Sequence, residues 1–150
     1  MNIKKIVYDT YENDYGFIDG EIKDHRHTIL THSNDKCIDY NRQLDIITWG
    51  IKKHDPINCD IIFDCSLFSA KCDVDVKKHT GLDEIIQKSI MNHPKFDSII
   101  EMIIIEIETN NYNKIGFICN YGKHRSVGWA ELIKKLYYNQ SFIKHINITK

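Results

Sequence analysis

The sequence predicts an α/β fold, a three-layer sandwich with a largely parallel sheet. Short apolar runs at 44–51, 59–65 and 114–119 are bounded by Gly, Pro, Asn and Asp, which is typical of buried strands. Segments with apolar residues at helical spacing lie between these runs and after them. Strands that alternate with helices in this way favour a mainly parallel sheet.

The bulk composition is that of one globular domain. The chain has 150 residues, of which 42% are hydrophobic and 27% are charged, so a single domain over 1–150 is expected. The formal net charge of -1 argues against an evenly basic nucleic-acid-binding protein. Neither a membrane-spanning run nor the apolar core of a signal peptide is present. We therefore expect a cytoplasmic protein without a membrane partner and with reduced cysteines.

The N-terminal segment carries few functional signals. Residues 3–11 have β character, and the two glycines that follow predict a hairpin or loop. His25 and His27 would share one face of a strand, but no third ligand stands at a suitable close spacing. We therefore predict no metal site, and the sequence implies no cofactor.

Three helices are expected in the rest of the chain. The first, over 80–93, can be capped by Thr80 or Asp83. The second covers 96–111, and the third begins near Ser126. Apolar residues at helical spacing mark the buried face of each helix. These residues are Ile85, Ile86 and Ile90, then Ile99, Ile100, Ile103, Ile104 and Ile107, and then Val127, Ala130, Ile133 and Tyr137, with Glu101 and Glu108 expected outside.

The stretch "FICNYGKHRSVGW", residues 117–129, carries the strongest chemical signal. A strand runs into a tight loop and then into a helix, whose first free N–H groups favour an anion in the loop. Gly122 lets the backbone curl inward or take a positive φ. Arg125 can present a two-pronged guanidinium to a phosphate or carboxylate, and His124 adds positive potential. Neutral hydrogen-bonding groups come from Asn120 and Ser126.

The same loop fits a second chemistry. Cys119 and Arg125 are spaced as in C-x5-R-S, which resembles the phosphate loop of cysteine-dependent phosphatases. In those enzymes a thiolate attacks phosphorus while the loop amides and the Arg hold the oxygens. Ile118 stands where many of them have His. The candidates for a general acid are Asp73, Asp75, Asp83 and Asp97. The remaining alternative treats Cys119 as a small buried residue at a strand end.

A wider resemblance favours binding over phosphatase chemistry. The loop "FICNYGKHRSV" is similar to the G-C-x-G-G-x-H-R-S loop of the RapZ C-terminal domain family. The run "ITWGIKKHDPINCDIIFDC" resembles the family's S-F-G-F-K-x-G-x-P-x-x-A-D-x-x-F-D, and "KKHTGLDEIIQKSI" resembles its R-P-x-T-G-L-D segment with the helix after it. The order and spacing of the three blocks agree, over residues 45–140, while 1–44 have no clear counterpart.

The resemblance implies a sensor or adaptor domain that binds a phosphorylated small molecule or an inorganic anion. In the family this domain binds an amino-sugar phosphate, glucosamine-6-phosphate, and a small RNA, and it is not known as a phosphatase. Carried over, the pocket uses Asn120, Tyr121, Gly122, Arg125 and Lys52. Self-association as a homodimer is implied in the same way.

Several positions depart from the family's pattern. Tyr121 replaces a small Gly, Ser66 replaces an Arg, and Lys71 and Cys72 stand where the family's pocket has a His. The motif G-x-x-x-x-G-K-[ST] of the family's nucleotide-binding domain is absent, and the basic tail is reduced to "SFIKHINITK". Anion binding is therefore the expectation, with a cysteine-dependent phosphatase and an RNA-binding adaptor as alternatives.

Overall fold

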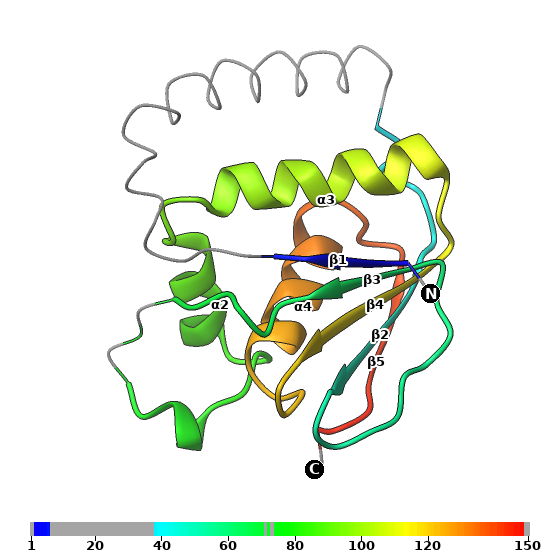
Figure 1. Cartoon of the computed structure of the whole chain (residues 1–150). Coiled ribbons are helices and arrows are strands. Elements are labelled where there is room, and N and C mark those ends of the chain that lie inside the picture. The colour runs from blue at the N-terminus through cyan, green and yellow to red at the C-terminus, as the bar shows by residue number, and fades with distance from the viewer. Residues whose placement is uncertain (1, 7–37, 71, 73, 149–150) are drawn as a thin grey trace.

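The computed structural model describes residues 2–6, 38–70, 72 and 74–148 (Figure 1). Within these ranges five strands form one sheet in the order β1-β3-β4-β2-β5, and every neighbouring pair is parallel. The predicted α/β fold with a parallel sheet is confirmed. The strands are β1 (Ile3–Lys5), β2 (Asp45–Gly50), β3 (Ile61–Asp64), β4 (Lys114–Cys119) and β5 (Phe142–His145). The helices are the 3-10 helix η2 (Val76–Lys78) and the α-helices α2 (Glu84–Met91), α3 (Phe96–Asn110) and α4 (Arg125–Leu136).

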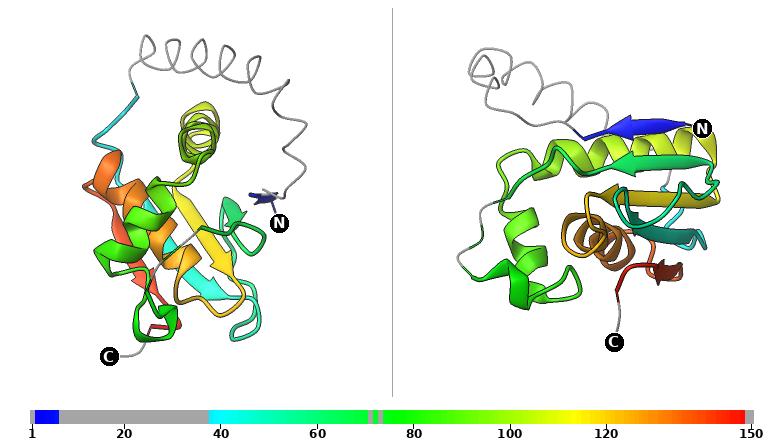
Figure 2. Two further views of the ribbon diagram at one scale, coloured as in Figure 1. Left: turned by 90° about the vertical axis from the view of Figure 1, so that its left-hand side faces the viewer. Right: turned by 60° about the horizontal axis from the view of Figure 1, so that its bottom comes forward.

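The sheet buries apolar side chains on both faces, because successive residues of a strand point to opposite sides. On one face Ile61, Phe63, Ile115 and Phe117 join a large core with residues of α2, α3 and α4. Figure 2 shows α2 and α4 side by side on this face. On the other face Ile47, Trp49, Ile62 and Ile118 form a smaller core, covered by Ile57 and Cys59 from the segment after β2.

The connections after β2 and β4 leave the sheet on opposite faces. The chain passes from β2 to β3 across β4, through the segment 51–60 that covers the smaller core. It passes from β4 to β5 across β2, through α4 in the larger core. Open α/β sheets commonly bind ligands at such a point, outside the carboxyl ends of the two strands. The fold therefore indicates the ends of β2 and β4 as the place to look for a site.

The buried stripe of α3 is confirmed, since Ile99, Ile100, Ile103, Ile104 and Ile107 are all in the core. Two predictions about helix faces are wrong. Glu101 is 5% exposed rather than outside, because it stands three residues before Ile104, at the edge of the apolar stripe. Ile85 is 40% exposed, while Ile86 and Ile90 are buried. The two tryptophans, Trp49 and Trp129, lie in the core as expected of packing residues.

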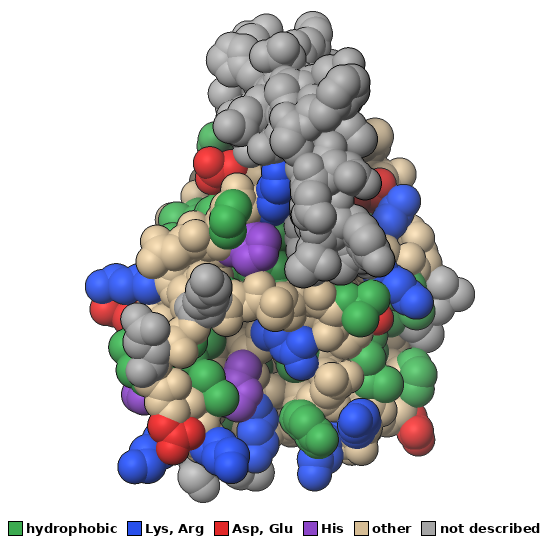
Figure 3. Space-filling view, turned by 60° about the vertical axis from the view of Figure 1, so that its left-hand side comes forward, with side chains coloured by type: hydrophobic (Ala, Val, Ile, Leu, Met, Phe, Trp, Pro, Cys, Tyr) green, Lys and Arg blue, Asp and Glu red, His purple; other side chains and the backbone are tan. Residues whose placement is uncertain are grey.

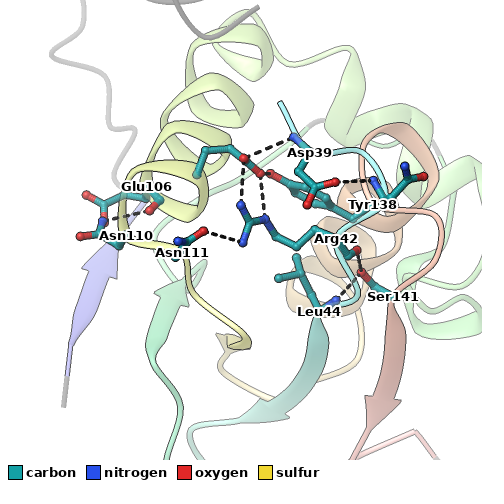
Figure 4. Close-up of polar contacts among 10 residues, drawn as sticks. Asp39, Arg42, Leu44, Glu106, Asn110, Asn111, Tyr138 and Ser141 are labelled. Atoms are coloured by element: carbon teal, nitrogen blue, oxygen red, sulfur yellow. Dashed lines mark hydrogen bonds and ion pairs between the residues drawn. The ribbon is translucent and has the colours of Figure 1, made fainter. Parts of the chain in front are cut away.

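An ion-pair network lies near the amino ends of β2 and β5, at the end of the sheet opposite the carboxyl ends of the strands (Figure 4). Nε and Nη2 of Arg42 each donate to a carboxylate oxygen of Glu108 at 3.0 Å. The hydroxyl of Tyr138 donates to the same carboxylate at 2.6 Å. Nearby, Ser141 Oγ accepts from the N–H of Leu44 at 2.9 Å. These contacts fasten the chain before β2 to α3 and to the end of α4.

Candidate functional site

The candidate site lies at the carboxyl edge of the sheet, where the segments after β2, β3 and β4 meet. The loop after β4 is bonded to the segment after β2. Cys119 O accepts from the N–H of Ile51 at 2.8 Å, and Asn120 O accepts from the N–H of Lys52 at 3.0 Å. The structure thus brings Lys52 next to the loop that the sequence singled out.

Gly122 has a φ of +72°, as its place in a tight loop predicted. A Cβ on Gly122 would stand 2.5 Å from Gly50 N and 2.7 Å from Trp49 C. The loop backbone therefore lies directly on the end of β2, at a distance that only glycine allows. A side chain here would push the loop off the sheet.

Helix α4 begins at Arg125, one residue earlier than predicted, and no side chain caps its N-terminus. The first N–H groups of a helix have no acceptor within the helix, and they carry the positive end of its dipole. Gly81 packs against this first turn, and its N–H donates to Lys123 O at 2.7 Å. Thr80 and Gly81, the T-G pair of the segment that resembles the family's R-P-x-T-G-L-D, therefore lie beside the candidate site.

Asp83 does not cap α2 in the predicted way. It occupies the N-cap position, but its carboxylate makes no hydrogen bond to the helix. Oδ2 of Asp83 instead accepts from the N–H of Thr80 at 3.0 Å and lies 3.1 Å from His79 Nδ1. The hydrogen bond from the N–H of Thr80, and to a smaller extent that from His79, lower the pKa of Asp83. The carboxylate therefore stabilises the turn before α2.

Arg125 makes contacts that sequence reasoning missed. Its Nη1 donates to Ser66 O at 2.6 Å and to Phe68 O at 3.1 Å. Both carbonyls belong to the segment after β3. Among the described residues, Nε and Nη2 of Arg125 have no hydrogen-bond acceptor, so these nitrogens remain able to bind an anion.

His124 also bonds to the protein. Its Nε2 lies 2.6 Å from Val76 O and 2.7 Å from His79 O. Carbonyl oxygens only accept, so Nε2 must carry the proton. The side chain therefore fastens the η2 segment to the start of α4, and Nδ1 is the ring atom left for a ligand.

Cys119 and Ser126 face the core. Cys119 is 2% exposed, and its Sγ lies 3.1 Å from Ser126 Oγ, which is fully buried. Cys65 lies in the same core, where burial raises the pKa of its thiol well above the ordinary value. Because the side chains of Cys119 and Ser126 are buried, neither of them lines the mouth of the loop. Any contact of Ser126 with a ligand would therefore have to come from its backbone N–H.

Basic and aromatic groups surround the mouth of the loop. Tyr121 is half exposed, and the ammonium groups of Lys52 and Lys53 lie 5.4 Å and 5.9 Å from the centre of its ring. Lys123, next in the loop, is exposed. Figure 3 shows Lys and Arg side chains along the lower half of the face that carries η2 and the carboxyl ends of the strands. The site therefore has a positive rim.

Asn147 lies at the candidate site, although the sequence did not single it out. Its Oδ1 accepts from the N–H of Gly50 at 2.8 Å and approaches Gly122. The signal in the sequence was an Asn two residues after the last strand, near the point where the carboxyl ends of parallel strands meet. Asp64, at the end of β3, is buried at the same edge, and its Oδ1 accepts from the N–H of Ser66 at 2.9 Å.

Metal binding finds no support in the part of the chain that the structure describes. No group of three or more His, Cys, Asp or Glu residues there could hold a metal ion. The candidates His25 and His27 lie outside the described residues. No helix within the described ranges is both long enough and apolar enough to cross a membrane.

Comparison with known proteins identifies the family of this chain. The family model of the RapZ C-terminal domain matches residues 42–149. A nucleotide-binding protein of Thermotoga sp. (strain RQ2) is 28% identical over 118 residues, which cover 70% of this chain and 42% of that protein. Nucleotide-binding proteins of Thermotoga petrophila and Thermosipho africanus are 27% identical over 118 residues and 29% identical over 102 residues. The matched region spans 42% of the former and 37% of the latter. The chain belongs to the RapZ C-terminal domain family.

Proposed function

We propose that this domain binds a phosphorylated small metabolite at the carboxyl ends of β2 and β4. The observation that carries the proposal is the uncapped N-terminus of α4, which follows a loop with Gly122 in the left-handed region. Such N–H groups and the helix dipole suit a phosphate. Family membership supports the same ligand class, since RapZ C-terminal domains bind phosphosugars.

Side chains around the loop would add charge to this binding. Lys52 and Lys123 extend from the two segments that border the site, and both are exposed. Arg125 keeps Nε and Nη2 for the ligand while its Nη1 holds the segment after β3. An amino-sugar phosphate is the finer expectation. Tyr121 stands beside the phosphate position, where its ring would contact the part of the ligand that is not phosphate.

The proposed role is that of a sensor or adaptor rather than an enzyme. Cys119, the candidate nucleophile, lies in the core beside Ser126. A nucleophile must reach the substrate, so this burial supports a packing role for the thiol. Turnover of an aryl phosphate that Cys119→Ser abolishes would instead establish the phosphatase alternative.

Isothermal titration calorimetry tests the proposal. Inorganic phosphate and glucosamine-6-phosphate should bind, and unphosphorylated glucosamine should not. Lys52→Ala should weaken the binding of both anions, because it removes a positive charge at the rim. The substitution leaves the backbone hydrogen bond of residue 52 in place. Lys114→Ala is the matched control for the loss of one positive charge, since Lys114 lies at the amino end of β4, away from the site. Absence of phosphate binding by the wild-type domain would refute the proposal.

RNA binding is a second candidate function, favoured by the positive rim. The exposed lysines at this edge include Lys52, Lys53 and Lys123, with Lys77 and Lys78 on η2. Phosphate backbones bind such clusters in a strongly salt-dependent way. An RNA affinity that falls steeply with salt, and that Lys123→Ala reduces, would support it.

Sedimentation of the same samples measures the self-association that the family resemblance implies.

A further inference from the structure

The segment after β5 reaches the anion loop through one side chain. Asn147 Oδ1 accepts a hydrogen bond from the N–H of Gly50 at 2.8 Å. The same oxygen would stand 3.0 Å from a Cβ placed on Gly122. Gly50 and Gly122 are in direct backbone proximity, as described above. These three residues therefore meet at one point beneath the proposed anion loop.

The backbone that carries Asn147 is held in place by its neighbours. His145 Nδ1 lies 2.8 Å from Thr48 Oγ1, and His145 Nε2 lies 2.8 Å from Glu131 Oε2. The N–H of Ile146 donates to Thr48 O at 2.9 Å. Each residue from 145 to 147 thus bonds to β2, to α4 or to both. The carboxamide of Asn147 is consequently presented from a fixed support.

We propose that Asn147 is a positioning residue for the anion loop, an inference that rests on the proposed function of that loop. Its hydrogen bond satisfies the partly buried N–H of Gly50 and fixes the end of β2. Gly122 packs on that end, so the position of Gly50 sets the position of the loop. Backbone N–H groups bind an anion well when they are already aimed at one point, because less ordering is then required on binding.

Loss of the carboxamide has two consequences for the loop. The N–H of Gly50 loses its acceptor, and the contact beneath Gly122 is emptied. The loop can then shift toward the vacated space, which would move the N–H groups that the proposed function assigns to the anion. Hydrogen bonds to an anion are stronger than neutral ones. If the shift of the loop removes one hydrogen bond between a loop N–H and the phosphate, phosphate should bind about fivefold more weakly, or weaker still.

Asn147→Ala and a matched control, Ser141→Ala, test the proposal. Ser141 Oγ accepts from the N–H of Leu44 at 2.9 Å, just before the opposite end of β2. Each variant thus removes one side-chain acceptor from one backbone N–H at an end of β2. Urea unfolding measures stability, and calorimetry measures phosphate affinity at a temperature where every variant is folded. Both variants should be less stable, and only Asn147→Ala should bind phosphate at least about fivefold more weakly.

The outcomes separate this inference from the proposed function. If the wild-type domain does not bind phosphate, the proposed function fails and the inference fails with it. If the wild type binds and Asn147→Ala binds equally well, the inference is overturned and the proposed function stands. An equal loss of affinity in Ser141→Ala would also overturn it, because general destabilisation would then explain the effect.

Asn147→Asp covers the case in which Asn147→Ala does not fold. Aspartate keeps the oxygen that accepts from Gly50, so this variant should fold. It also places a negative charge beside the loop, which should weaken phosphate binding about tenfold at low salt and less at high salt. Wild-type affinity in Asn147→Asp would overturn the placement of residue 147 at the anion loop.

Discussion

Arg125→Ala should destabilise the fold as well as weaken anion binding at the proposed site. Arg125 was predicted as an anion clamp, but its Nη1 already donates to Ser66 O at 2.6 Å and to Phe68 O at 3.1 Å. These bonds join the first turn of α4 to the segment after β3. Alanine removes both and leaves the two carbonyls without their charged donor. The variant therefore changes the protein even when no ligand is present.

The expected loss follows from these two contacts. A hydrogen bond that involves a charged group contributes roughly 1.5–3 kcal/mol. Both bonds share one nitrogen and are only partly buried, so water can partly replace them. The free energy of unfolding should therefore fall by about 2–4 kcal/mol. For a domain of this size the midpoint of thermal unfolding should fall by roughly 5–15 °C.

Urea unfolding followed by circular dichroism measures this loss, with Arg125→Lys as the comparison. Lysine keeps the charge but not the planar fork, so it should recover only part of the stability. Phosphate at 100 times its dissociation constant should stabilise the wild type by about 2.7 kcal/mol and Arg125→Ala by less. A change below about 0.5 kcal/mol without ligand would show that the carbonyl contacts do not stabilise the fold.

Two further variants test the loop and the opposite edge. Gly122→Ala should lower stability by more than about 1 kcal/mol in urea unfolding, because a Cβ would stand 2.5 Å from Gly50 N at a φ of +72°. It should also abolish phosphate binding in calorimetry. Burial opposes the charge of Glu108, but hydrogen bonds from Arg42 and Tyr138 outweigh it, so its pKa lies below the ordinary 4.5. The ionised Glu108 carboxylate therefore stabilises the fold fully above pH 4.5, and this stabilisation is lost as the pH falls through the lowered pKa. Glu108→Gln should be less stable than the wild type at neutral pH and should lack this acid dependence.

Local patterns in the sequence were sufficient for the main elements of the fold. The apolar runs around Ile46, Ile61 and Ile115 became β2, β3 and β4, because buried strands need apolar side chains on both faces. Periodicity reports which residues are buried but not which strands are neighbours. The order β1-β3-β4-β2-β5, and with it the meeting of β2 and β4 at their carboxyl ends, therefore required the structure.

The site was predictable as a set of residue types and not as a set of contacts. Arg125 and His124 were chosen because they can bind anions, and both donate or lie close to backbone carbonyls of the segment 66–79. Such partners leave no local pattern, since any residue supplies a carbonyl. Asn147 was missed for the same reason, because its partner is the backbone N–H of Gly50.

These backbone contacts give the loop after β4 support on each side. His124 joins it to η2, Arg125 joins it to the segment after β3, and Asn147 supports Gly122 from the end of β5. A loop held at three points keeps its N–H groups in place before a ligand arrives, which is the condition for binding an anion without a large ordering penalty. Tyr121 is the exposed aromatic residue of this loop, so ligand specificity should depend on its ring while phosphate affinity depends on the supported backbone.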